Sequence, residues 1–189
     1  MEEQTILDEF NDADPTKKHI LIMAHFGRAV YYAQLLEQQC VNMLAIQELC
    51  DKVSFTEEDV DECFSKYDFS KKTLGAFSNI IAESYNMNQV DIVELKEVIQ
   101  MRNHYTHSYF RFNDVLFHSE SGKLRMVKDF FRFTIKAKSI DVKLESYAAQ
   151  YNTMNHVTEE KILSMMQSVK DEWSDKVIDE SYDSTKKNN

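Results

Sequence analysis

The sequence predicts an all-α protein, an up-and-down bundle of four to six helices with a long first helix. Three observations predict this fold. Only three glycines and one proline interrupt the 189 residues, so tight turns are scarce and long helices are favoured. Apolar residues recur every three or four positions through most of the chain, which is the period of an amphipathic helix. Nine methionines and twelve phenylalanines supply a large apolar interior.

The chain has the length of one domain with a polar segment at each end. Residues 1–14 are polar and acidic, and we expect them to be a flexible N-terminus. Residues 15–178 are predicted to form a single helical domain. Residues 179–189 carry almost no apolar side chains, which predicts a disordered tail.

The first long helix is predicted over residues 15–50. Asp14 is a good N-cap residue, and Pro15 suits the first helical turn. His19, His25 and Arg28 lie near the start of the helix, and we interpret them as surface or edge residues. The inward stripe is Ile22, Phe26, Ala29, Ala33, Leu36, Cys40 and Met43.

Two shorter helices are predicted next. Thr56 precedes three acidic residues, the pattern of an N-cap followed by acids that the helix dipole stabilises. The second short helix ends near residues 86–88. Its apolar stripe is Leu74, Phe77, Ile81 and Tyr85.

The C-terminal half contains two more long helices, predicted over residues 90–115 and 123–152. A break at residues 117–122 separates them, and a short hairpin over residues 115–127 is the alternative interpretation. Thr158 is predicted to cap a final helix. The inward stripes are Leu95, Val98, Tyr105, Tyr109 and Phe112 in the first long helix, and Val127, Phe131, Ile135, Ile140, Leu144, Tyr147 and Tyr151 in the second.

One stretch of the helix over residues 90–115 is chemically unusual. Arg102 falls on its apolar stripe, where a cation is unfavourable unless it is paired or faces a solvated cleft. Asn103 and His107 are four residues apart, so they share one helix face, and Arg102 is long enough to reach the same space. A cation, an amide and an imidazole in one place are suited to holding and processing a phosphodiester.

The sequence Arg102-Asn103-x3-His107 resembles the Arg-polar-x3-His signature of HEPN domains, which are small all-α proteins. Tyr109 extends it to Arg-x4-His-x-Tyr, the form seen in HEPN toxins that pair with a nucleotidyltransferase-like antitoxin. The architecture of residues 16–155 is also similar to that family.

The resemblance implies a metal-independent endoribonuclease that acts as a toxin or defence effector. His107 would move a proton of the RNA 2′-hydroxyl, Arg102 would bind the phosphate, and Asn103 would orient His107 or contact the phosphate. The products would be a cyclic phosphate and a 5′-hydroxyl. The resemblance further implies a homodimer whose two motifs line one cleft, and adenylylation of Tyr109 by a nucleotidyltransferase-like antitoxin. Core packing is the alternative role for Tyr109.

Charge is unevenly spread along the chain. The net charge of −10 argues against wholesale coating by nucleic acid. Residues 121–143 nevertheless carry seven basic residues against two acidic ones, and they form a candidate RNA-binding strip. An equally favoured alternative is that these basic residues only form a solvated helix face. The basic residues at the start of this strip are Lys123, Arg125, Lys128 and Arg132.

Other classes of protein are less favoured. His104 and His107 have a helical spacing that suits a metal, but no third ligand is evident, so we expect no metal site and no cofactor. A non-catalytic helical bundle that binds a protein or nucleotide partner remains an alternative. Three cysteines without metal-ligand spacing favour a reduced, cytoplasmic compartment. No apolar run is long enough to span a membrane.

Overall fold

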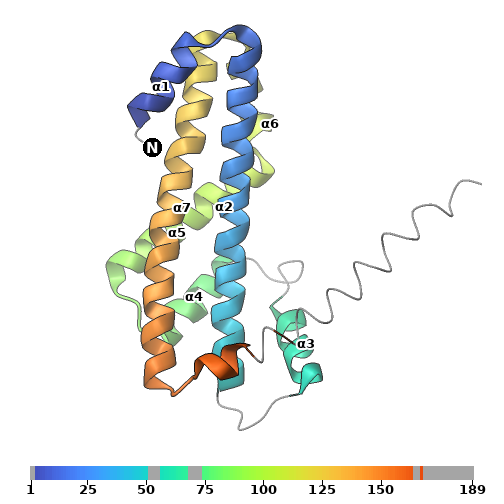
Figure 1. Ribbon diagram of the computed structural model, residues 1–189, viewed down its shortest axis with the longest axis vertical. Coiled ribbons are helices and arrows are strands. Elements are labelled where there is room, and N and C mark those ends of the chain that lie inside the picture. The colour runs from blue at the N-terminus through green and yellow to red at the C-terminus, as the bar shows by residue number, and fades with distance from the viewer. Residues whose placement is uncertain (1–2, 51–55, 68–73, 164–166, 168–189) are drawn as a thin grey trace, which may run out of the picture.

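Two long helices that run parallel to one another form the frame of the molecule. The computed structural model describes residues 3–50, 56–67, 74–163 and 167. Within this part of the chain every regular element is a helix, and none is a strand. Helices α2 (Pro15–Cys50) and α7 (Glu120–Met154) lie side by side along the long axis (Figure 1). The all-α prediction is therefore confirmed, and the alternative hairpin is not formed.

The shorter helices pack on this frame. Helix α1 (Glu3–Asp12) contacts α7, whereas α3 (Glu57–Lys66) and α4 (Leu74–Ser84) contact α2. Helix α5 (Gln89–His107) contacts α2, α4 and α7, so it closes the bundle.

A short segment connects α5 to α7. It consists of α6 (Tyr109–Asn113) and the 3₁₀ helix η1 (Asp114–His118), which packs against the start of α7. Ser119 caps α7, since its Oγ accepts from the backbone N–H of Gly122 at 3.0 Å. A Cβ atom on Gly122 would lie 2.3 Å from the carbonyl oxygen of Leu116. The close approach of η1 to α7 therefore requires a glycine at position 122.

The core lies between α2 and α7 and is closed by α1, α4 and α5. Each large side chain removed from water there contributes roughly 1.5–3 kcal/mol to stability. The predicted stripes of α2 and α4 are confirmed in their central positions. Fully buried members of the core include Ile22, Leu36, Met43, Phe77, Ile81, Leu95, Phe130 and Phe133.

The predicted N-caps are confirmed by hydrogen bonds. The Oδ1 atom of Asp14 accepts from the backbone N–H of Lys17 at 2.8 Å. The Oγ1 atom of Thr56 accepts from the backbone N–H of Asp59 at 3.2 Å. Asn88, which the sequence analysis did not single out, caps α5 by accepting from the backbone N–H of Asp91 at 2.9 Å.

A polar cluster, which we call the Asp91 cluster, joins the start of α5 to α7. It consists of Asn88, Asp91, Lys143 and Tyr147. Lys143 and Tyr147 each donate to the Asp91 carboxylate at 2.7 Å. These two donors lower the pKa of Asp91.

For residues 3–12, the expectation of a flexible N-terminus over residues 1–14 is corrected by α1. Ile6 and Phe10 are four residues apart and share one face, so both are buried against the bundle. Glu3 adds an ion pair with Arg132 of α7. The many acids of this segment obscured its two apolar anchors.

The helix predicted over residues 90–115 is shorter than expected. It ends at His107, and Ser108 interrupts it with φ −141° and ψ −9° before α6 begins. The interruption changes the direction of the following side chains. Phe112 is 68% exposed instead of buried, and Val115 is also exposed.

Two further predictions about side chains are wrong. Ile135 was placed on the inward stripe of α7 but is exposed, whereas His25 was placed at the surface but is buried. The His25 ring packs edge-on against Phe131, with ring centroids 6.5 Å apart, and burial lowers its pKa. The predicted tail at residues 179–189 lies outside the described residues.

Candidate functional site

Three side chains converge at the C-terminal end of α5, and we call them the motif cluster: Arg102, Asn103 and His107. The Nη1 atom of Arg102 donates to Oδ1 of Asn103 at 2.9 Å. The same nitrogen lies 3.3 Å from Nε2 of His107. Because a guanidinium group only donates, this second contact is a hydrogen bond when Nε2 carries no proton. Arg102 therefore favours the tautomer of neutral His107 whose Nε2 can act as a base.

Helix α2 supplies a fourth side chain to this cluster. Glu37 forms an ion pair with the Nη2 atom of Arg102, and the two side chains are only 15% and 14% exposed. Burial lowers the pKa of Arg102. The sequence analysis left Glu37 out of the site. Glu37 lies four residues after the inward-facing Ala33, and this spacing could have indicated that Glu37 lies beside the core.

The motif cluster is open to solvent on one side. Asn103 and His107 are exposed, while the Arg102 side chain is only 14% exposed and is paired with Glu37. A ligand therefore has access to the imidazole and the amide, whereas the guanidinium group contacts Glu37, Asn103 and His107. This arrangement places an imidazole, which can act as a base, beside a cation that attracts anions.

His104 belongs to a different environment, although it also lies on α5. Its ring is exposed and contacts the rings of Tyr105 and Tyr109, each with a centroid separation of 5.5 Å. No hydrogen bond joins His104 to the motif cluster in the described part of the chain. Nor do the described residues contain three His, Cys, Asp or Glu side chains placed to hold a metal ion.

Tyr109 points into the interior between α6 and α7. It is 2% exposed, and its hydroxyl donates to Oδ2 of Asp129 at 3.1 Å. Tyr105 donates to the backbone carbonyl of Asp129 at 3.3 Å. Burial and the Asp129 carboxylate raise the pKa of Tyr109. Its adenylylation remains a prediction, and the reaction would require this buried contact to open.

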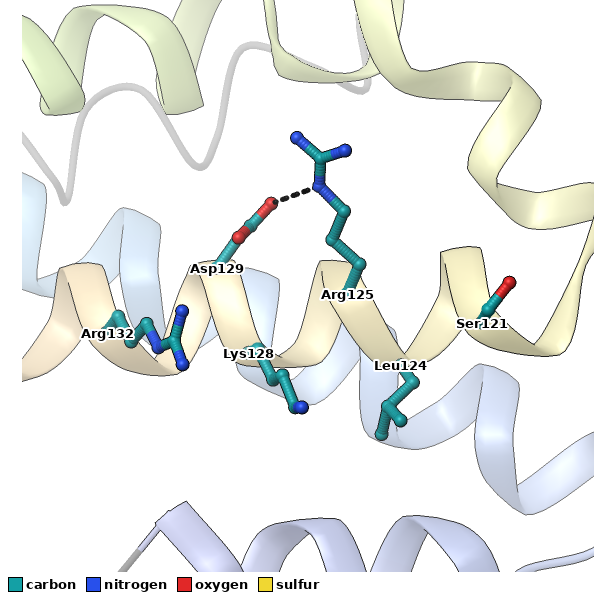
Figure 2. A pocket seen from close by; sticks show the side chains of 6 residues that line it. All are labelled: Ser121, Leu124, Arg125, Lys128, Asp129 and Arg132. Carbon is teal, nitrogen blue, oxygen red and sulfur yellow. Dashed lines mark ion pairs between the residues drawn. The ribbon is translucent and has the colours of Figure 1, made fainter.

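A pocket with a volume of about 500 Å³ lies along one face of α7. Figure 2 shows Arg125 and Asp129 directed to one side of this face and Lys128 to the other. We call this site the α7 pocket. Its lining residues are Ser121, Leu124, Arg125, Lys128, Asp129 and Arg132.

Three of the four predicted RNA-binding residues therefore lie together in the α7 pocket. The fourth, Lys123, does not line it and instead forms an ion pair with Glu120 at 2.9 Å. Acidic residues of α5 neutralise two cations further along α7, namely Lys136 and Lys143. The strip is thus less uniformly available to an anion than its sequence implies.

The motif cluster and the α7 pocket make contacts on different sides of α5. Arg102 of α5 pairs with α2, whereas Tyr105 of α5 and Tyr109 of α6 reach α7. Among the described residues, no hydrogen bond or ion pair joins the motif cluster to a basic residue of α7. The two sites therefore share no direct polar contact between the described residues.

Comparisons of this chain with protein-family models, with curated proteins and with solved structures give no match. None of the described helices combines the length and the apolar character needed to cross a membrane.

Proposed function

We propose that this protein is a HEPN-type, metal-independent endoribonuclease that acts as a toxin or defence effector. The observation that carries the proposal is the motif cluster. Its side chains, predicted from the resemblance, form one hydrogen-bonded group with a solvent-accessible imidazole. A cation beside an unprotonated imidazole nitrogen is the minimum that RNA cleavage by the 2′-hydroxyl needs.

In the proposed reaction, Nε2 of His107 takes the proton of the RNA 2′-hydroxyl. The 2′-oxygen then forms a bond to the adjacent phosphorus, and the bond from phosphorus to the 5′-oxygen breaks. The leaving 5′-oxygen takes up a proton, so the products are a 2′,3′-cyclic phosphate and a 5′-hydroxyl. Arg102 stabilises the negative charge that develops on the phosphate oxygens. Asn103 holds the guanidinium group beside the imidazole.

We further propose that the active form is a homodimer. One His107 accepts a proton, and a second proton must reach the leaving oxygen. A second motif cluster in the same cleft supplies an imidazole for that step. A nucleotidyltransferase-like antitoxin is the proposed regulatory partner, with Tyr109 as its target.

The activity is tested with purified full-length protein and RNA in excess EDTA. His107→Ala is expected to lower the rate of cleavage by about 10²–10⁴-fold, because it removes a general base. His104→Ala is the matched control, since it removes a neighbouring exposed imidazole that is not bonded to Arg102. Equal rates for the two variants would refute the assigned role of His107.

A non-catalytic interaction module is the second candidate function. The observation that favours it is the ion pair between Glu37 and Arg102, which neutralises the only cation of the motif cluster. Under this alternative, the native protein cleaves no RNA class in the same assay. Mass spectrometry of the purified protein must then show an unmodified Tyr109, because adenylylation would silence a true nuclease.

A further inference from the structure

The α7 pocket is a second basic site, distinct from the motif cluster. Arg125, Lys128 and Arg132 are three and four residues apart, so they lie along one face of α7. Two of them, Arg125 and Lys128, are directed to opposite sides of that face, as Figure 2 shows. A ligand lying along the face between them would meet a cation on each side.

The cations of the pocket are not equally available. The Nε and Nη2 atoms of Arg132 donate to the two carboxylate oxygens of Glu3 at 3.1 and 2.7 Å, so α1 occupies this guanidinium group. Lys128 forms no ion pair among the described residues. Arg125 is 66% exposed, and its Nε atom lies 3.7 Å from Oδ2 of Asp129. Lys128 and Arg125 are therefore the cations that a ligand can engage.

The single acid of the pocket is already engaged. Oδ2 of Asp129 accepts the hydroxyl of Tyr109 at 3.1 Å, and the backbone carbonyl of the same residue accepts from Tyr105. These bonds fix Asp129 toward α5 and α6. Arg125 makes only a long contact with it, so its guanidinium group keeps most of its donors free.

We propose that the α7 pocket binds the phosphates of a single-stranded RNA, with Arg125 and Lys128 as the contacting residues. The inference rests on the proposed function, because it assigns the pocket to the same substrate. A guanidinium group matches phosphate oxygens in a two-pronged geometry, and an ammonium group adds a point charge. In a chain with a net charge of −10, a local positive site also decides where a polyanion approaches.

The shape of the pocket favours a strand over a small free anion. Arg125 and Arg132 are exposed and Lys128 is partly exposed, and Arg125 and Lys128 are directed to the two sides of one helix face. A small anion would need several donors around one point, whereas a strand can contact separated cations in succession. The pocket is joined to the segment after His107 through the bond between Asp129 and Tyr109.

The experiment measures RNA binding in a full-length His107→Ala background, so that the RNA stays intact. Fluorescence anisotropy of a labelled single-stranded RNA is followed over a series of salt concentrations. Arg125→Ala/Lys128→Ala is compared with Lys96→Ala/Lys138→Ala, a control pair on exposed positions outside the pocket. Both double variants remove two positive charges, so a general charge effect is the same in each.

In the pocket variant, the slope of log K for RNA binding against log salt concentration is expected to be about 1.4 smaller in magnitude than in the parent protein. Two phosphate contacts are lost, and each contact to a single strand contributes roughly 0.7 to the slope. The control pair is expected to keep the parent slope. Equal slopes for both pairs would overturn the proposal, as would the absence of RNA binding by the parent protein. Circular dichroism and thermal unfolding confirm that both variants are folded.

Two further arms separate this inference from its alternatives. Inorganic phosphate is titrated into the same proteins. If it raises the melting temperature only where Arg125 and Lys128 are present, while the RNA slopes are equal, the site takes a free anion and the proposal is wrong. Cleavage is measured separately with His107 intact. If the slope depends on the pocket but no RNA is cleaved, the proposed nuclease activity is refuted and RNA binding by the α7 pocket is supported. If RNA is cleaved but the slopes are unchanged, the nuclease activity is supported and RNA binding by the α7 pocket is refuted.

Discussion

The ion pair between Arg102 and Glu37 gives the sharpest prediction about the candidate site. Glu37→Leu and Arg102→Met each remove one partner and leave the other charged at a position that is only about 15% exposed. Each single substitution is therefore expected to destabilise the fold. The double substitution leaves no uncompensated charge, so it should cost less than the sum of the two.

The expected magnitude follows from the partial burial of the pair. Two unit charges about 4 Å apart attract by about 4 kcal/mol at an effective dielectric constant near 20. Removing one partner of a fully buried pair costs about 3–5 kcal/mol. Because both side chains keep some contact with water, we expect about 2–3 kcal/mol for each single substitution. The coupling energy in the double-mutant cycle should be about 1–3 kcal/mol.

The assay is urea unfolding followed by circular dichroism, with the four proteins of the cycle measured together. The control cycle uses Lys136 and Glu97, an ion pair whose side chains are 43% and 53% exposed. Exposed pairs of this kind couple by less than about 1 kcal/mol. If the Arg102–Glu37 coupling is no larger than that of the control pair, the inferred buried support for Arg102 is wrong.

Three other predictions concern stability. Gly122→Ala should destabilise the protein by about 1–3 kcal/mol, because the added Cβ would lie 2.3 Å from a backbone carbonyl oxygen. Gly27→Ala should stabilise α2 by about 0.5–1 kcal/mol, because the added Cβ meets no neighbouring atom within 4 Å. Urea unfolding midpoints that shift in the same direction for both variants would contradict this pair of predictions. Phe112→Ser should change the free energy of unfolding by less than about 0.5 kcal/mol, because Phe112 is exposed. Phe10→Ala should lower the free energy of unfolding by about 3–5 kcal/mol, because Phe10 is buried. A larger loss for Phe112→Ser than for Phe10→Ala would disprove the assigned exposures. Asp91→Asn should destabilise the protein at about pH 7 but not well below about pH 4. Because the folded-state pKa of Asp91 is lowered, its contribution to stability is complete above the unfolded-state pKa of about 3.9 and is lost as the pH falls through the folded-state pKa. A pH-independent difference between the two proteins in urea unfolding would exclude this linkage.

The main helices were predictable because their apolar residues keep the helical period over many turns. Asp14 and Thr56 marked helix starts correctly, since N-capping depends on local chemistry. The end of α5 was missed because Ser108 is neither glycine nor proline, and the apolar pattern continues past it. Helix α1 was missed because acidic and polar residues dominate its sequence, although Ile6 and Phe10 are buried against the bundle.

The candidate site was predictable only in part. The spacing of Asn103 and His107 placed them on one face, and the long side chain of Arg102 reached them. Glu37 lies 65 positions before Arg102 in the sequence, so its pairing depends on how α2 packs against α5. The α7 pocket likewise depends on Glu3 and Asp129, whose ion pairs decide which cations of the strip remain available.

The chemistry of the RNA ends tests the central claim most directly. RNA cleaved by the native protein in excess EDTA is analysed by mass spectrometry, beside a His107→Ala sample prepared in the same way. The proposed mechanism predicts a 2′,3′-cyclic phosphate and a 5′-hydroxyl at each cut, formed by the native protein alone. Products with a 3′-hydroxyl and a 5′-phosphate, or cleavage that EDTA abolishes, would contradict it.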